Sequence, residues 1–151
     1  MSINIDGSSD PFYRYKRDKL NLRFNIGRKR TYITNILDIE SKINRDLKLI
    51  KKYLNKKLSI SVNWKSKENE LELGGIYNEK DLEDCLQCFI NEYILCNKCG
   101  NPETKLKYSK KKDILKMSCN ACGKRSVLEC SDEDIYESII KIFKTESKKR
   151  T

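Results

Sequence analysis

Cys96-Asn97-Lys98-Cys99-Gly100 and Cys119-Asn120-Ala121-Cys122-Gly123 are two Cys-x-x-Cys-Gly stretches, with nineteen residues between Cys99 and Cys119. This spacing is typical of a zinc site, because each pair directs two sulfurs toward one tetrahedral ion. Four thiolate ligands leave no coordination position for a substrate. We therefore expect one structural Zn²⁺ per chain, bound by Cys96, Cys99, Cys119 and Cys122 and stabilising a small β module. The alternative is four free or disulfide-bonded cysteines.

Composition limits the class of protein. The chain has 151 residues, of which 38% are hydrophobic and 36% charged, so it can bury only a modest core. No apolar run is long enough for a membrane span, and the first ten residues lack the apolar core of a signal peptide. An odd number of cysteines, seven, fits a reducing compartment better than a disulfide framework. We therefore expect a cytoplasmic location without a membrane partner.

The charges are concentrated in blocks. Basic residues outnumber acidic ones by eight to one over residues 14–30 and by seven to one over residues 42–57, whereas acids outnumber bases by eight to one over residues 68–92. Two separate basic blocks favour a polyanionic partner such as RNA. The alternative is a solvated, lysine-rich surface.

The order of the patterns predicts an α+β fold. We expect a flexible N-terminal tail over residues 1–11, then a small α/β domain with a mixed sheet and two or more helices over residues 12–93. A zinc ribbon is expected over residues 94–130, and a C-terminal helix with a basic tail over residues 131–151. The chain is long enough for one ordinary domain or for two small ones that pack together.

Within the α/β domain, hydrophobic alternation predicts half-buried strands at residues 20–26 and 59–65, each followed by a hairpin partner at residues 31–36 and 70–73. Helices are expected to be capped by Asp38, Asp46 and Asn78. Cys85 and Cys88 fall within the third of these helices, where core packing is a simpler explanation than a second metal site.

The basic blocks supply candidate RNA contacts. A turn between the first two strands and one face of the second helix should present cations to phosphates, without reading bases. The candidate RNA-binding or ribosome-binding residues are Arg28, Lys29, Arg30, Arg45, Lys48, Lys51 and Lys52.

Catalytic patterns are missing from the sequence. The chain has no histidine, so it lacks the common catalytic triad, and it has no Gly-x-x-x-x-Gly-Lys-Ser/Thr loop. We expect no bound nucleotide of its own and no hydrolase activity. If chemistry is involved, the chain should lend a residue to another protein's site.

Three stretches together carry a family resemblance: Phe12-Tyr13-Arg14-Tyr15-Lys16, Cys96 to Thr104 with its Asn-Pro-Glu-Thr extension, and Ser118 to Gly123. They resemble the N-terminal domain of eukaryotic translation initiation factor five, over nearly the whole chain. The resemblance implies a GTPase-activating protein for initiation factor two, which supports start-codon recognition in the ribosomal preinitiation complex. The implied partners are the GTP-bound factor through its γ subunit, the small ribosomal subunit and initiator tRNA, with a monomer expected outside the complex.

By position, the resemblance makes Arg14 an arginine finger that acts in trans, with Arg30 and Lys52 in supporting roles. Arg30 stands where the family has a lysine, and the turn around Gly27 is shorter than the family's. The family's C-terminal helical-repeat domain has no counterpart in this sequence. Two alternatives remain: a subunit like initiation factor two β, which shares the fold, or a zinc-ribbon nucleic-acid-binding module with no effect on a GTPase.

Overall fold

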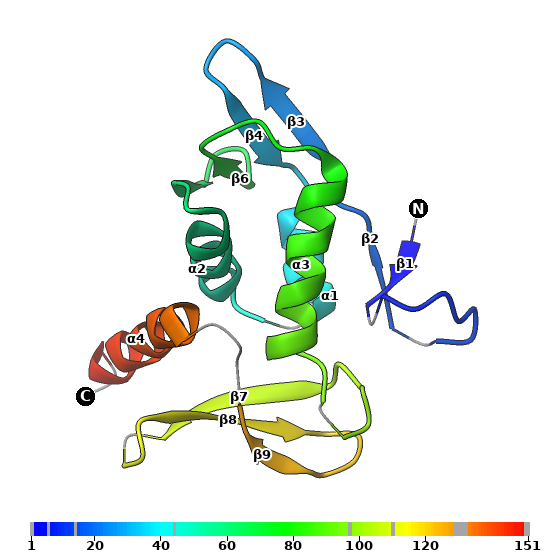
Figure 1. Ribbon diagram of the computed structural model, residues 1–151, viewed down its shortest axis with the longest axis vertical. Coiled ribbons are helices and arrows are strands. Elements are labelled where there is room, and N and C mark those ends of the chain that lie inside the picture. The colour runs from blue at the N-terminus through cyan, green and yellow to red at the C-terminus, as the bar shows by residue number, and fades with distance from the viewer. Residues whose placement is uncertain are drawn as a thin grey trace.

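The computed structural model describes residues 2–5, 7–13, 15–43, 45–96, 98–109, 111–128 and 133–149. Figure 1 shows a sheet and three helices in the upper part of the molecule, a three-stranded ribbon below them and a last helix beside α2. The elements are β1 (Ser2–Asn4), β2 (Lys16–Asp18), β3 (Leu22–Asn25), β4 (Arg30–Ile33), α1 (Ile36–Ile43), α2 (Leu47–Leu58), β5 (Val62–Lys65), β6 (Glu70–Leu73), α3 (Glu79–Tyr93), β7 (Thr104–Ser109), β8 (Ile114–Cys119), β9 (Arg125–Val127) and α4 (Glu133–Lys149). Across these ranges, none of the helices combines the length and the apolar character needed to cross a bilayer.

The α+β class is confirmed, but the main sheet is not mixed. Its strand order is β3-β4-β6-β5, and each of these neighbouring pairs is antiparallel. The expectation of a mixed sheet was wrong because two tight hairpins, β3–β4 and β5–β6, form its edges. A short turn can join only antiparallel neighbours, whereas parallel neighbours need a long crossover.

Side-chain caps define two of the helices as expected. Asp46 accepts a hydrogen bond from the Lys48 amide at the start of α2, and Asn78 accepts one from the Asp81 amide at the start of α3. Asp38, in contrast, is not a cap. It lies inside the first turn of α1, which begins at Ile36, so it favours the helix through its charge near the positive end of the helix dipole.

The helices pack their apolar faces on one side of the sheet. Leu71 and Leu73 of β6 are fully buried beneath them. Between α2 and α3, the rings of Tyr53, Phe89 and Tyr93 form a cluster with centroid distances of 5.1, 5.4 and 5.9 Å. This cluster lies at the end of α3 that leads into the first metal-ligand pair, so the core holds the start of the ribbon in place.

The described part of the N-terminal segment, residues 2–5 and 7–11, packs against the domain, unlike the flexible tail expected over residues 1–11. β1 pairs with β2 in an antiparallel arrangement, and Ile5 is only 1% exposed. The fully buried Arg17 of β2 donates to Glu83 of α3 over 2.7 Å. The segment is mostly polar, so its sequence did not indicate that Ile5 would be buried or that β1 would pair with β2. These two features hold the segment against the domain.

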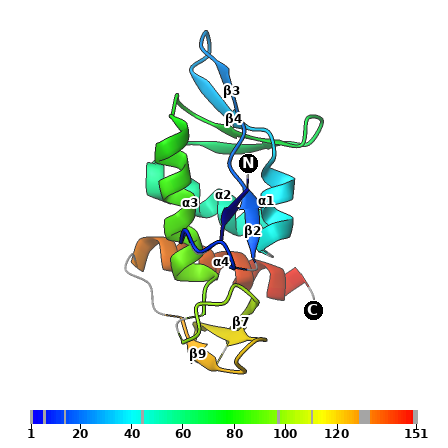
Figure 2. The same ribbon diagram turned by 90° about the vertical axis from the view of Figure 1, so that its right-hand side faces the viewer.

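The ribbon and α4 share the core of the α/β domain. Leu115 of β8 and Ile139 of α4 are fully buried and belong to the same hydrophobic cluster as Ile94, which follows α3. Lys144 of α4 also forms an ion pair of 3.2 Å with Asp113 in the β7–β8 turn. Figure 2 shows α4 crossing above the ribbon strands. The ribbon therefore packs against the first domain, and the boundaries at residues 93 and 130 stay predictions.

The β3–β4 hairpin projects from the sheet, at the top of Figure 1. Its inner end is buried through Leu20 and Ile33, as expected for a half-buried strand, but Phe24 is 45% exposed and Ile26 is 71% exposed. The predicted strand is present, but its predicted burial is wrong at the outer end, because none of the described helices covers that end of the hairpin.

Candidate metal centre and basic surfaces

The fold brings the four predicted metal ligands together. The sulfur atoms of Cys96, Cys99, Cys119 and Cys122 all lie within 4.8 Å of one another. The distance from Cys96 Sγ to Cys122 Sγ is 3.7 Å, and that from Cys99 Sγ to Cys119 Sγ is 3.6 Å. Zn–S bonds of about 2.3 Å in a tetrahedron place neighbouring sulfurs about 3.8 Å apart. The cluster therefore has the dimensions of a four-thiolate metal site.

Both turns around the cluster have the same backbone design. The Gly100 amide donates to the Cys96 carbonyl over 2.8 Å, and the Gly123 amide donates to the Cys119 carbonyl over 2.9 Å. These glycines have φ angles of 72° and 76°, a conformation that costs little only for glycine. The Asn120 amide also donates to the Glu103 carbonyl, which joins the two turns.

The local hydrogen bonds favour a thiolate at Cys96, whereas burial and the neighbouring sulfurs raise the pKa of the Cys99 thiol to about 12. Burial alone raises the pKa of the Cys96 thiol, but the backbone amides of Cys99 and Lys98 point at its sulfur and bring the pKa down to about 6. A thiol with this pKa is largely ionised at neutral pH, and only the ionised form binds a metal.

Tyr15, in the aromatic segment of the family resemblance, contacts Asn101 and Glu103, which follow the first cysteine turn. The Tyr15 hydroxyl donates to Glu103 over 2.5 Å, and its ring meets Tyr13 edge to face at 5.9 Å. Phe12, in contrast, does not anchor the segment, since it is 93% exposed. Arg14, the predicted arginine finger, lies outside the described residues. Tyr15, the residue after Arg14, is hydrogen-bonded to Glu103, which lies between the first cysteine turn and β7.

The other candidate cations occupy two places. Arg28 and Lys29 are exposed in the β3–β4 turn, where Lys29 adopts a φ of 55°. Arg30 begins β4, and its Nε atom is 4.0 Å from the Glu72 carboxylate. Lys48, Lys51 and Lys52 lie along α2 and line a hollow that also includes Val62 and Ile142.

Arg45 is not available to RNA, contrary to our expectation. It is only 7% exposed, and its guanidinium donates to the Thr104 carbonyl over 2.7 Å and to the Tyr93 carbonyl over 3.1 Å. It also donates to the Thr104 hydroxyl. Burial lowers the pKa of Arg45 to about 10, so the side chain stays charged at neutral pH. Arg45 thus joins the start of α2, the end of α3 and the ribbon.

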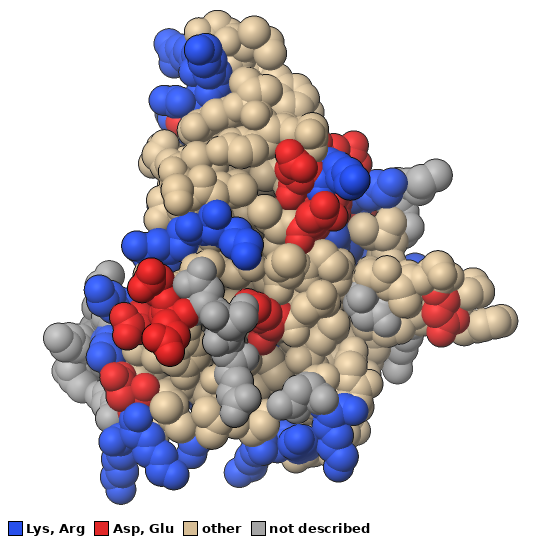
Figure 3. Space-filling model, in the orientation of Figure 1, with Lys and Arg blue, Asp and Glu red and all other residues tan. Residues whose placement is uncertain are grey.

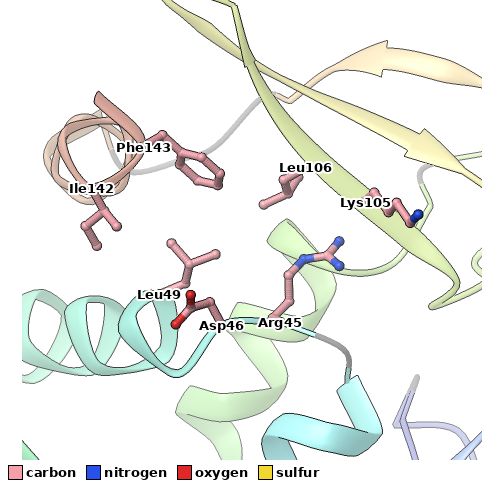
Figure 4. A pocket seen from close by; sticks show the side chains of 7 residues that line it. All are labelled: Arg45, Asp46, Leu49, Lys105, Leu106, Ile142 and Phe143. Carbon is pink, nitrogen blue, oxygen red and sulfur yellow. The ribbon is translucent and has the colours of Figure 1, made fainter. Parts of the chain in front are cut away.

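Figure 4 shows Arg45 on one side of a cavity of about 330 Å³, with its guanidinium directed toward β7. The cavity lies between α2, β7 and α4. Its apolar wall consists of Leu49, Leu106, Ile142 and Phe143.

Comparison with known proteins identifies the family of this chain. Residues 6–125 match a family described as a domain found in initiation factors 2B and 5. The chain belongs to this family. Eukaryotic translation initiation factor 5 of Saccharomyces cerevisiae is 35% identical over 133 residues, which is 85% of this chain and 32% of the yeast protein. The mouse factor is also 35% identical over 133 residues, 85% of this chain and 31% of the mouse protein. The factor of Phaseolus vulgaris is 29% identical over 136 residues, 88% of this chain and 30% of that protein. The chain thus spans about a third of the length of these relatives.

Cys85 and Cys88, the third Cys-x-x-Cys pair of this initiation-factor domain, differ in burial. Cys85 is half-buried in α3, as core packing requires, whereas Cys88 is exposed. The helix turns by about 100° per residue, so positions three apart share a side of the helix but not the same depth.

Two roles of charged residues in this initiation-factor domain were missed in the sequence. Within the acidic stretch over residues 68–92, Glu70 pairs with Arg23 over 2.6 Å and Glu83 pairs with Arg17, two residues of the first basic block. The predicted ribbon is also basic, since residues 94–130 contain nine lysines and arginines and three acids. A count of charge within the predicted ribbon would have identified this excess.

Proposed function

We propose that this chain acts in translation initiation, as a GTPase-activating protein for initiation factor two in the ribosomal preinitiation complex. It would not hydrolyse GTP itself. Membership of the family of initiation factors 2B and 5, with relatives named eukaryotic translation initiation factor 5, carries the proposal. The position of Tyr15 against Glu103 supports it, because that contact ties the aromatic–arginine segment to a rigid metal module.

The proposed chemistry requires one arginine from outside the GTPase. Transfer of the γ-phosphoryl group spreads negative charge over its oxygens, and a guanidinium inserted in trans can bind two of them at once. Arg14 would supply this group, and Arg30 and Lys52 would support activation. The exposed Phe12 ring, two residues before Arg14, is then free to pack on the GTPase.

The metal would hold this module together. We propose that Zn²⁺ binds to Cys96, Cys99, Cys119 and Cys122, as the spacing of their sulfurs suits. Its role would be structural. The remaining proposed partners are the γ subunit of initiation factor two, the small ribosomal subunit and initiator tRNA, the last two reached by the hairpin tip and the α2 lysines.

The experiment is single-turnover GTP hydrolysis by preinitiation complexes, with saturating amounts of this protein or of its variants. Arginine fingers contribute roughly 10³–10⁵-fold in rate, so Arg14→Ala and Arg14→Lys should lose most of the stimulation. Lys19→Ala, a nearby change of the same charge, should keep it. The affinity of each variant for the GTP-bound factor is measured in parallel. An Arg14→Ala variant that binds normally and stimulates fully would remove Arg14 from the mechanism.

A constitutive subunit like initiation factor two β is the second candidate, because the family description names a factor 2B beside factor 5. Such a subunit would bind the γ subunit equally well with GDP and with GTP, and would not accelerate hydrolysis. A GTPase activator should prefer the GTP-bound form. Binding to the two nucleotide states, measured beside the hydrolysis rate, distinguishes the two candidates. A simple zinc-ribbon module would show neither effect.

A further inference from the structure

The outer face of the ribbon contains a basic groove that neither the hairpin tip nor α2 contributes to. The groove has a volume of about 500 Å³. Its cations are Lys107, Lys112, Lys116 and Arg125, and its other lining residues are Met117, Ser118, Ser126 and Val127. We call these eight residues the ribbon groove. Figure 3 shows Lys and Arg gathered along the lower edge of the molecule, where the ribbon lies in Figure 1.

The strand register concentrates these charges. Lys107 of β7 is directly opposite Lys116 of β8, and Arg125 of β9 is opposite Ser118. Residues opposite each other in an antiparallel pair have Cβ atoms about 5 Å apart, and like charges at that distance destabilise the pair. The ribbon therefore carries a charge arrangement that opposes its own folding.

The carboxylates that the structure describes within the ribbon face elsewhere. The two acids of residues 98–128 are Glu103, which accepts a hydrogen bond from Tyr15, and Asp113, which pairs with Lys144 and accepts one from Tyr108. Within the described part of the chain, no cation of the ribbon groove takes part in an ion pair. Among the described residues, the groove therefore has an excess of positive charge, which a polyanion could neutralise.

We propose that the ribbon groove binds the phosphate backbone of a folded RNA, as a contact separate from the hairpin tip. Two serines add hydroxyl donors of the kind that proteins use on phosphates. None of the described residues that line the groove is aromatic, so they form no stacking platform of the kind on which single-stranded bases are bound. Val127 is its one exposed large apolar residue, which is too little for the apolar anchors of a protein interface. The proposal does not depend on GTPase stimulation.

The test measures binding of the zinc-loaded 151-residue chain to an RNA hairpin of about 20 base pairs over a range of salt concentrations. The variant is Lys107→Ala/Lys116→Ala. The matched control is Lys67→Ala/Lys80→Ala, which removes the same charge from exposed positions on the β5–β6 turn and α3. Loss of two phosphate contacts should lower the slope of log affinity against log salt by about two units. The control should keep the wild-type slope.

Thermal unfolding of both variants gives an independent readout. Because Lys107 and Lys116 repel each other, their removal should leave the melting temperature unchanged or raise it while RNA affinity falls. If the salt slope falls equally for both double variants, RNA binding depends only on the net charge of the chain. If the slope falls for neither variant, the ribbon groove does not bind RNA. Vesicles of phosphatidylserine are tested as the alternative ligand. If the groove variant loses binding to the vesicles but keeps the wild-type salt slope for the RNA, the groove binds membranes and the RNA assignment is wrong.

Discussion

Arg45 offers the sharpest stability test, because the sequence suggested an RNA contact and the structure shows a buried clamp. We predict that Arg45→Ala destabilises the chain. The substitution removes the donors to two backbone carbonyls, those of Tyr93 at the end of α3 and Thr104 at the start of β7. A buried acceptor left without a donor costs about 1–3 kcal/mol, so the two carbonyls together cost about 2–6 kcal/mol. The adjoining cavity gives water a route to them, which favours the lower half of that range.

The assay is thermal unfolding of the zinc-loaded chain, followed by circular dichroism. For a chain of this length, each kcal/mol shifts the midpoint by roughly 2–4 °C, so Arg45→Ala should lower the midpoint by about 10 °C. Arg45→Lys should recover only part of the loss, because one ammonium group lacks the planar fork that reaches Tyr93 and Thr104 together. Arg28→Ala, at an exposed position, should change stability by less than about 0.5 kcal/mol. An Arg45→Ala chain that melts like wild type but shows a lower salt slope for RNA would refute the clamp and restore the RNA contact.

Other predictions concern the metal, the exposed ring and the two basic sites. Elemental analysis of chain purified without chelator should give one zinc per chain, and Cys119→Ser/Cys122→Ser should lose it; a stoichiometry near zero in wild type would contradict the site. Phe12→Ala should weaken binding to the GTP-bound factor by about tenfold or more without lowering the melting temperature, since the ring makes no core contact; an unchanged affinity would exclude it from the interface. Reversing the charge of Lys29 and Lys51 should lower both the affinity for the initiation complex and its salt dependence, whereas unchanged values would make both sites plain solvated surface.

The sequence alone determined those features that depend on neighbours in the chain. Two Cys-x-x-Cys pairs, each followed by glycine, were enough to predict the ligand cluster, because each turn is built from five consecutive residues. Asp46 and Asn78 could be identified as caps because a cap bonds to amides two or three residues away. The β5–β6 hairpin could be located because its strands are joined by a short turn.

Tertiary structure decided what each charged side chain faces. Arg45 and Lys48 lie in the same basic block, yet Arg45 is buried against Thr104, 59 residues away, and Lys48 is exposed. No local pattern separates them, because the acceptors that make burial of a guanidinium tolerable belong to other elements. The same holds for Lys107, which lies opposite Lys116 only because β7 and β8 pair in one register. The charge of a side chain is fixed by its residue type, but the electrostatic energy of that charge depends on its distance from other polar and charged groups, which only the folded structure sets.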